Sequence, residues 1–351
     1  MSINISQKVF GKTCQGEDVI EYTVKNSSGS YISLISYGAA IRCACVPDKN
    51  GTLRDVVLGY DTVSDYEKED YFFGATIGRV ANRIEDAHFT LNNKEYSLVV
   101  NNGTRNCLHG GNYGFDKRNW IGEIAGNSVI FHRVSPDGEE NFPGNLSVKV
   151  TYSFTEENEI IVDYEAVSDA DTIVNMTNHT YFNLSGHDSG SIEYHTLQIE
   201  ADQFAQSNDE CLATGNIINV AGTSFDFRTP KVLGTVFDDL DSQQKLVGGY
   251  DHSFLIRGYN GMVRKAAQAV SPNSGIALSV YTNKPSVHFY SGNFMKKMPS
   301  KGGRGYDYRG GLCLETQYLP NAMKNQNFPS IILHAGDMYL FRTKYCFSVK
   351  R

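Results

Sequence analysis

Short segments in which apolar and polar residues alternate recur along most of the chain. Examples are residues 21–26 (EYTVKN), 31–38 (YISLISYG), 147–154 (SVKVTYSF), 159–167 (EIIVDYEAV) and 277–283 (ALSVYTN). Because successive side chains of a strand point to opposite faces of a sheet, this period of two predicts half-buried strands. Polar or glycine-containing stretches separate the segments, as turns separate antiparallel strands. The pattern predicts an all-β fold.

The chain shows no internal division. It has no heptads, no repeat of fixed period and no proline- or serine-rich linker. Its 351 residues lie within the size that a large β-sandwich reaches as one unit. We therefore expect a single domain over residues 1–351, and the lack of a coiled-coil seam favours a monomer.

Composition narrows the class of protein. Hydrophobic residues make up 40% and charged residues 20%, which is typical of a soluble globular protein. The formal net charge of −7 disfavours nucleic acid as a partner, because binding its phosphates requires lysine and arginine. The first residues, MSINISQKVF, do not resemble a secretory signal, and no apolar stretch is long enough to span a membrane. Seven scattered cysteines favour reduced thiols, so the predicted location is the cytoplasm.

Two polar clusters lie in the first third of the chain. In GRVANRI (78–84), Asn82 and Arg83 offer an amide and a guanidinium fork to hydroxyl or carboxylate oxygens. In NNGTRNCLHGG (101–111), the glycines after His109 allow the backbone to turn closely beneath the imidazole. Taken alone, the first cluster is better explained by a structural salt bridge and the second by a structural histidine.

Two further clusters lie in strand-like segments. NMTNHTYFNLSG (175–186) contains His179 and Tyr181, which would share a face on a strand. In GLCLETQYLPNA (311–322), Glu315 interrupts an otherwise apolar pattern. A carboxylate in such a buried position is either paired or functional.

Asp251 and His288 belong to two lesser clusters, GGYDHSF (248–254) and KPSVHFYSGN (284–293). Asp251 and His252 look like a dyad, but adjacent strand residues point to opposite faces and would not act together. Asp251 alone is the better candidate, as an acceptor for substrate hydroxyl groups.

Motifs of several other chemistries are missing from the sequence. There is no G-x-S-x-G nucleophile elbow, no H-E-x-x-H helix and no phosphate-binding P-loop. His109, His179 and Glu315 match a two-histidine, one-carboxylate metal set in type, and their wide separation neither supports nor excludes a metal.

The order and the amino-acid sequences of these clusters resemble the motifs of the aldose 1-epimerase, or galactose mutarotase, family. The resemblance rests on GRVANRI, LHGGNYGFDKRNW, NHTYFNLSG, GGYDHSF and CLETQYLPNA, which occur in the family's order over nearly the whole chain. It implies a galactose mutarotase-like β-sandwich with large twisted antiparallel sheets around a sugar-binding groove. It also implies interconversion of the α and β anomers of free hexoses such as galactose and glucose, with no metal or other cofactor.

The resemblance assigns roles to individual residues. It implies that Glu315 is the general base, His179 the general acid, and His109 a second imidazole beside the ring oxygen. It places Asn82, Arg83, Tyr181 and Asp251 at substrate-contacting positions. His288 stands where related sequences often have glutamine, so we expect an altered sugar preference or pH dependence.

The proton transfers that open and reclose a sugar ring require Glu315 ionised and His179 protonated in one direction of the reaction. Mutual electrostatics in a partly desolvated groove are expected to favour that charge pattern and to give a pH profile with two limbs. Three alternatives stay open: a non-catalytic sugar-binding or regulatory protein, an epimerase of hexose phosphates, and a glycosidase using Glu315 and Asp251.

Overall fold

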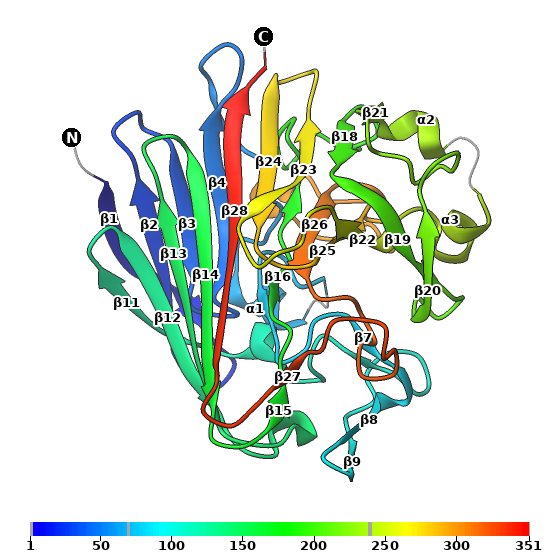
Figure 1. The fold of residues 1–351 in the computed structure, drawn as a ribbon. Coiled ribbons are helices and arrows are strands. Elements are labelled where there is room, and N and C mark those ends of the chain that lie inside the picture. Colours follow the sequence, from blue (N-terminus) through cyan, green and yellow to red (C-terminus); the bar gives the residue numbers. More distant parts are fainter. Residues whose placement is uncertain (1–2, 69–70, 238–240, 351) are drawn as a thin grey trace.

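The computed structural model describes residues 3–68, 71–237 and 241–350. Almost all regular structure in this part is antiparallel β-sheet, which confirms the predicted all-β fold. Figure 1 shows the sheets arranged as broad layers, with the two ends of the chain well apart. Among the described residues, no helix is both long and apolar enough to cross a membrane.

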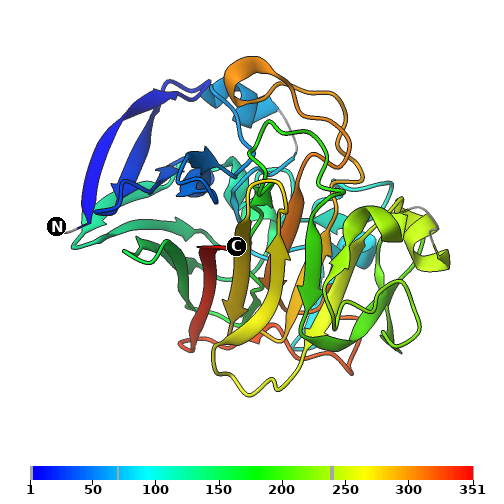
Figure 2. The same cartoon turned by 90° about the horizontal axis from the view of Figure 1, so that it is seen from above.

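The first layer is a five-stranded meander near the N-terminus, coloured blue in Figure 1. Its strands follow the chain order: β1 (Asn4–Lys12), β2 (Asp18–Lys25), β3 (Tyr31–Ile35), β4 (Ala40–Pro47) and β5 (Leu53–Asp55). Figure 2, from above, shows this layer facing the first strands of a second, larger sheet.

The larger sheet has nine strands and joins distant parts of the chain. Its C-terminal strand β28 lies between β14 and β24, as Figure 1 shows. In spatial order the strands are β11 (Ile121–Ala125), β12 (Ser128–Ser135), β13 (Leu146–Phe154), β14 (Glu159–Ser168), β28 (Met338–Val349), β24 (Ile276–Thr282), β23 (Arg264–Val270), β18 (Thr196–Ile199) and β21 (Lys231–Val232).

A six-stranded sheet packs against the second half of this layer. In spatial order its strands are β17 (Tyr181–Phe182), β26 (Leu312–Gln317), β25 (Ser286–Tyr290), β22 (Asp251–Ile256), β19 (Ala201–Ser207) and β20 (Ala213–Asn219). The described residues also form four two-stranded sheets: β6 (Thr76–Ile77) with β16 (Thr177–Asn178), β7 (Arg83–Ile84) with β10 (Cys107–Leu108), β8 (His88–Leu91) with β9 (Lys94–Ser97), and β15 (Thr172–Ile173) with β27 (Ile332–Leu333).

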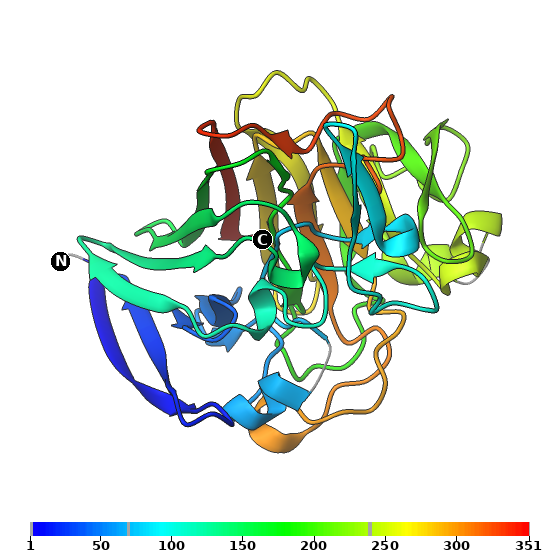
Figure 3. The same cartoon turned by 90° about the horizontal axis from the view of Figure 1, so that it is seen from below.

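Helices are short and peripheral. Figure 3 shows the yellow-green helices of residues 233–237 and 242–247 at the far end from the N-terminus. The α-helices are α1 (Val63–Lys68), α2 (Leu233–Phe237) and α3 (Ser242–Val247), and the 3₁₀ turns are η1 (Glu85–Ala87), η2 (Phe115–Lys117), η3 (Glu139–Asn141) and η4 (Lys301–Gly303).

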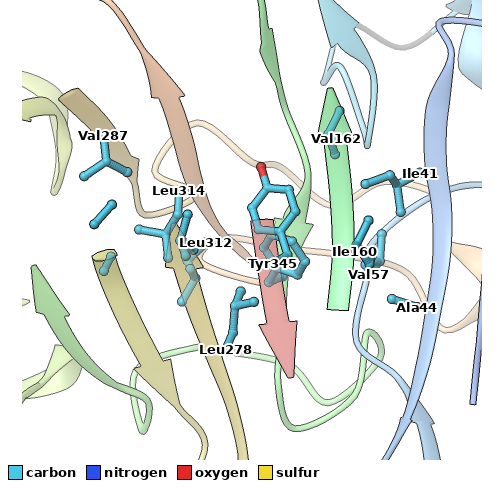
Figure 4. Packing of buried hydrophobic residues seen from close by; sticks show 14 of the residues in the cluster. Ile41, Ala44, Val57, Ile160, Val162, Leu278, Val287, Leu312, Leu314 and Tyr345 are labelled. Atoms are coloured by element: carbon cyan, nitrogen blue, oxygen red, sulfur yellow. The ribbon is translucent and has the colours of Figure 1, made fainter. Parts of the chain in front are cut away.

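One large hydrophobic cluster holds the three sheets together, and it runs from Tyr22 to Phe347. Figure 4 shows Ile41 of β4, Ile160 of β14, Leu314 of β26 and Tyr345 of β28 in this cluster. Each fully buried side chain of this size stabilises the fold by about 1.5–3 kcal/mol. The apolar face of β26 thereby fixes the opposite, polar face of the same strand.

Candidate active site

One face of the six-stranded sheet forms a wall of polar and ring side chains. Register places Ser253, His288 and Glu315 in one row across β22, β25 and β26, and Asp251, Tyr290, Cys313 and Tyr181 in the row beside it. The intervening residues point the other way, and His252 packs edge-on against Phe225 in the core. The expectation that Asp251 and His252 diverge is therefore confirmed.

The opposite wall comes from the loops around β7 and β10. Asn82 (φ 63°) and His109 (φ 52°) both adopt left-handed backbone conformations, which non-glycine residues rarely adopt. The turn is completed by Gly110, where an added Cβ would lie 2.0 Å from the carbonyl oxygen of Gly78. The predicted close turn beneath His109 is present, and only glycine fits it.

Between these walls lies a pocket of about 530 Å³. All eight residues selected from the sequence line it: Asn82, Arg83, His109, His179, Tyr181, Asp251, His288 and Glu315. His179 lies in the connection between β16 and β17, and its ring centroid is 5.1 Å from that of Tyr181. The two rings thus line the same pocket, although His179 itself is not in a strand.

His179 and Glu315 meet at the bottom of the pocket. His179 Nε2 is 3.6 Å from Glu315 Oε1, and both side chains are buried. Glu315 Oε2 is also buried and has no hydrogen-bond partner among the described residues. A buried carboxylate oxygen is normally bonded, so this oxygen is available to a ligand.

Burial shifts the pKa values of this pair in opposite directions. It raises the pKa of Glu315 well above its ordinary value, with a further contribution from Asp251 that Arg83 opposes. It lowers the pKa of His179 to about 4. Both shifts favour the uncharged forms in the pocket without sugar, because a low dielectric penalises each charge.

His109 is held in one tautomer. The backbone N–H of Asn82 donates to His109 Nδ1 at 3.2 Å, so in the neutral ring Nε2 carries the proton. Burial, together with His179, lowers the pKa of His109 well below its ordinary value. His109 is therefore a neutral donor through Nε2.

Asp251 lies in a saturated network. Arg83 Nη1 is 3.3 Å from Oδ2, and His288 Nε2 is 2.7 Å from Oδ1. Ser253 Oγ lies 2.8 Å from the other His288 nitrogen, Nδ1. Burial alone would raise the pKa of Asp251, but Arg83 and His288 hold it below the ordinary value, so this carboxylate is ionised.

Sequence reasoning missed three neighbours of the pair. Phe72 places its ring centroid 4.6 Å from that of His109 and 5.6 Å from that of His179, and nothing in its local sequence signals this. Tyr290 and Cys313 each lie two residues from a selected residue. Extending the strand alternation from His288 and Glu315 would have found both.

Among the described residues, two groups bring histidine, cysteine or carboxylate atoms close enough to hold a metal ion. One is His179, Cys313 and Glu315, and the other is Cys43, Cys45 and Asp55. The first differs from the set that the sequence left open, since Cys313 takes the place of His109.

The fold and the pocket define the class of protein: a β-sandwich with a polar pocket in which a buried carboxylate lies beside an imidazole. Known proteins specify the family. The family model for aldose 1-epimerase matches residues 21–346. The chain is 41% identical to a galactose mutarotase of Bos taurus over 348 residues, covering 99% of both chains. It is 38% identical to an aldose 1-epimerase of Escherichia coli (strain K12) over 328 residues, covering 93% of this chain and 94% of the relative.

Solved structures agree over the whole chain. A GalM/aldose epimerase homologue from C. elegans superimposes with a TM-score of 0.86 at 31% identity. A galactose 1-epimerase from Lactobacillus acidophilus NCFM gives the same TM-score at 30% identity, and in both cases all of each chain is covered. The chain therefore belongs to the aldose 1-epimerase family, and it is an isomerase.

Proposed function

We propose that the pocket interconverts the α and β anomers of free hexoses, such as galactose and glucose, through Glu315 and His179. The observation that carries this proposal is the buried carboxylate–imidazole pair at 3.6 Å, in which one carboxylate oxygen has no partner among the described residues. Opening a sugar ring requires one proton to leave the anomeric hydroxyl and one to reach the ring oxygen. Two adjacent proton-exchanging groups supply both transfers.

The cycle needs one proton on the pair. In the closed-ring complex, ionised Glu315 takes the proton of the anomeric hydroxyl while protonated His179 gives its proton to the ring oxygen. The ring opens to the aldehyde, and the pair is left as neutral carboxyl and neutral imidazole. Rotation about the bond between the carbonyl carbon and its neighbour exposes the other face, and the reverse transfers close the opposite anomer.

The directions of the two pKa shifts indicate which protonation state of Glu315 and His179 the protein favours without sugar. Burial stabilises the neutral pair, which accompanies the open-chain aldehyde. The ionised pair therefore depends on hydrogen bonds from the sugar, above all to Oε2 of Glu315. Without sugar, the pair is thus in the protonation state that it has after the ring has opened.

Asn82, Arg83, Asp251 and His288 are the proposed contacts to sugar hydroxyls, with Tyr181 as a ring contact and His109 Nε2 as a donor beside the ring oxygen. Hexose phosphates fit less well, because Arg83 is already paired with Asp251, and Asp209 and Glu210 add negative charge to the pocket lining. The available oxygen of Glu315 beside His179 favours catalysis over binding alone.

The decisive experiment follows pure α-galactose toward anomeric equilibrium by polarimetry, with chelator present. Native protein is compared with Glu315→Gln and His179→Asn, and with the surface variants Glu95→Gln and His334→Asn as matched controls. Acceleration by the native protein and both controls, with loss in both pocket variants, supports the proposal. Equal activity in all five proteins contradicts the assigned roles, and inactivity toward every free aldose contradicts the substrate class.

The remaining assignments are proposals of the same kind. We propose that residues 1–351 form one domain, which the single cluster from Tyr22 to Phe347 supports, and that the protein is a monomer without nucleic-acid or membrane partners. The seven free cysteines support a cytoplasmic location. Light scattering of the purified protein and fractionation of source cells test the monomer and the location.

A further inference from the structure

Three metal-ligand types lie together at the edge of the pocket: His179 and Glu315 line it, and Cys313 is fully buried beside them. A ring nitrogen of His179, the sulfur of Cys313 and a carboxylate oxygen of Glu315 all lie within 4.8 Å of one another. Cys313 Sγ is 3.7 Å from His179 Nδ1, and Glu315 Oε1 is 3.6 Å from Nε2 of the same ring. The proposed proton cycle makes no use of the thiol.

This set matches the ligands of zinc-type cations. Thiolate, imidazole and carboxylate bind Zn²⁺ at about 2.0–2.3 Å, so their donor atoms lie about 3.3–3.8 Å apart around a tetrahedral ion. His179 Nε2 and Glu315 Oε1 already lie within that range. The sulfur of Cys313 faces Nδ1 of the same ring, so binding of an ion at Nε2 requires the Cys313 side chain to turn toward that nitrogen. Three protein ligands leave the fourth position open toward the pocket.

The buried Oε2 of Glu315, which has no hydrogen-bond partner among the described residues, is also a suitable metal acceptor, so a cation would compete for it with the sugar. The nearby positive charge of Arg83 does not oppose a cation strongly, since Asp251 lies 3.3 Å from it. The site therefore combines a free acceptor with a soft sulfur donor.

The second cysteine group provides the contrast. Cys43 and Cys45 place their sulfurs 3.4 Å apart next to Asp55. There, however, Lys301 Nζ lies 2.5 Å from Asp55 Oδ2, and backbone N–H groups of Ala44 and Val57 donate to Oδ1. The ammonium group of Lys301 already pairs with the Asp55 carboxylate. The Cys43, Cys45 and Asp55 group therefore serves as the control site.

We infer that His179, Cys313 and Glu315 form an inhibitory site for a thiophilic divalent cation such as Zn²⁺. The inference rests on the proposed roles of Glu315 and His179, because a bound cation would occupy both proton-exchanging groups at once. Inhibition is therefore competitive with the sugar. The enzyme is active without the ion, and a bound ion inhibits turnover of the sugar.

The activity test measures the Zn²⁺ concentration that halves the rate of α-galactose conversion, each variant being compared with its own rate in chelator. Loss of an outer-shell partner already weakens metal binding about 10- to 100-fold. Cys313→Ser should therefore raise the inhibitory concentration at least about tenfold, whereas the double variant Cys43→Ser, Cys45→Ser should leave it unchanged. Excess galactose should protect the native enzyme.

The binding test uses Co²⁺, whose thiolate-to-metal charge-transfer band reports a bound cysteine directly and needs no activity. The band should appear in the native protein and in the double variant, should be absent from Cys313→Ser, and should fade with galactose. A band with no inhibition would contradict the acid–base roles rather than the site. Unchanged inhibition in Cys313→Ser, or no thiolate band in the native protein, overturns the site itself. If Cys313→Ser does not fold, the galactose effect on the native band decides the matter.

Discussion

Asp251 and Glu315 are both buried carboxylates of the pocket and yet opposite in character. Asp251 has Arg83 and His288 as partners, and its pKa lies below the ordinary value. Glu315 has only a distant imidazole, with one oxygen unpartnered among the described residues, and its pKa lies well above the ordinary value. Partners, and not depth of burial, therefore decide which carboxylate is a fixed anion and which can exchange a proton.

The largest effect is expected from removing the proton-exchanging carboxylate. Glu315→Gln should lower kcat about 10²- to 10⁴-fold, the range for loss of a positioned acid or base, with little change in KM. Steady-state polarimetry over a range of galactose concentrations measures both constants. A rise in KM with kcat unchanged would show that Glu315 acts in binding, and would contradict the proposed difference between Glu315 and Asp251.

The matched change at the fixed anion should act on binding and on stability. Asp251→Asn leaves the Arg83 guanidinium without its counter-charge, and breaking such a buried pair costs about 3–5 kcal/mol. KM should rise and the free energy of unfolding, measured with urea, should fall. A variant as stable as the native protein would mean that Asp251 is not held as a paired anion.

The pH dependence of stability should separate the two residues further. Folded Asp251 has a pKa below the unfolded value of 3.8, so its stabilising contribution is present above pH 3.8 and is lost as the pH falls below it. Folded Glu315 has a pKa above the unfolded value of 4.5, so stability falls as the pH rises from 4.5 toward the folded pKa. A folded pKa that differs from the unfolded pKa by one pH unit changes the free energy of unfolding by about 1.4 kcal/mol.

Urea unfolding of native protein and of both amide variants, from pH 3 to pH 8, measures these slopes. Compared with native protein, Glu315→Gln should lessen the loss of stability above pH 4.5. Asp251→Asn should lessen the loss at the acid end, to which other carboxylates with lowered pKa values also contribute. Slopes of the same sign for both residues would contradict the opposite pKa directions.

The pH profile of the reaction should show the same asymmetry. The free enzyme is active with one proton on the pair, and a second proton enters His179 only near its pKa of about 4. The acid limb of kcat/KM should therefore lie well below the ordinary imidazole value of 6.5. A midpoint at 6.5, measured with galactose in constant-ionic-strength buffers, would show that burial does not control His179.

The smallest effect is expected at His288. His288→Gln keeps a donor for Asp251 but loses the contact to Ser253, and one hydrogen bond is worth about 0.5–1.5 kcal/mol. We expect kcat/KM to change by no more than about tenfold, with a shift in the galactose-to-glucose preference or in the pH profile. Identical rates, preference and profile would mean that the imidazole adds nothing to what an amide provides.

The sequence was most informative where local rules apply. Period-two alternation predicted the strands, and the glycines after His109 predicted the close turn that Gly110 provides. Glu315 stood out because it interrupts an apolar strand. The same alternation carries Cys313 to the pocket side of β26, so this residue was accessible to sequence reasoning as well.

Local sequence patterns do not predict which distant segments come into contact. Arg83 and Asp251 are 168 residues apart, and Cys313 and His179 are 134 residues apart. Their meeting depends on the pairing of β22, β25, β26 and β17 over the shared hydrophobic cluster. Phe72 reaches the two imidazoles with no local pattern to indicate it.

The sequence by itself determined the all-β class, the family and eight of the side chains that line the pocket, because alternation and motif order are properties of the chain itself. Only the tertiary structure decided which of these groups are charged. Burial and partners exist only after distant strands have paired, and the cost of a charge depends on both. The sequence suggested an ion pair between Glu315 and His179, whereas burial in the folded pocket favours the neutral forms of both. Of the two carboxylates, Asp251 is the one that its partners keep ionised.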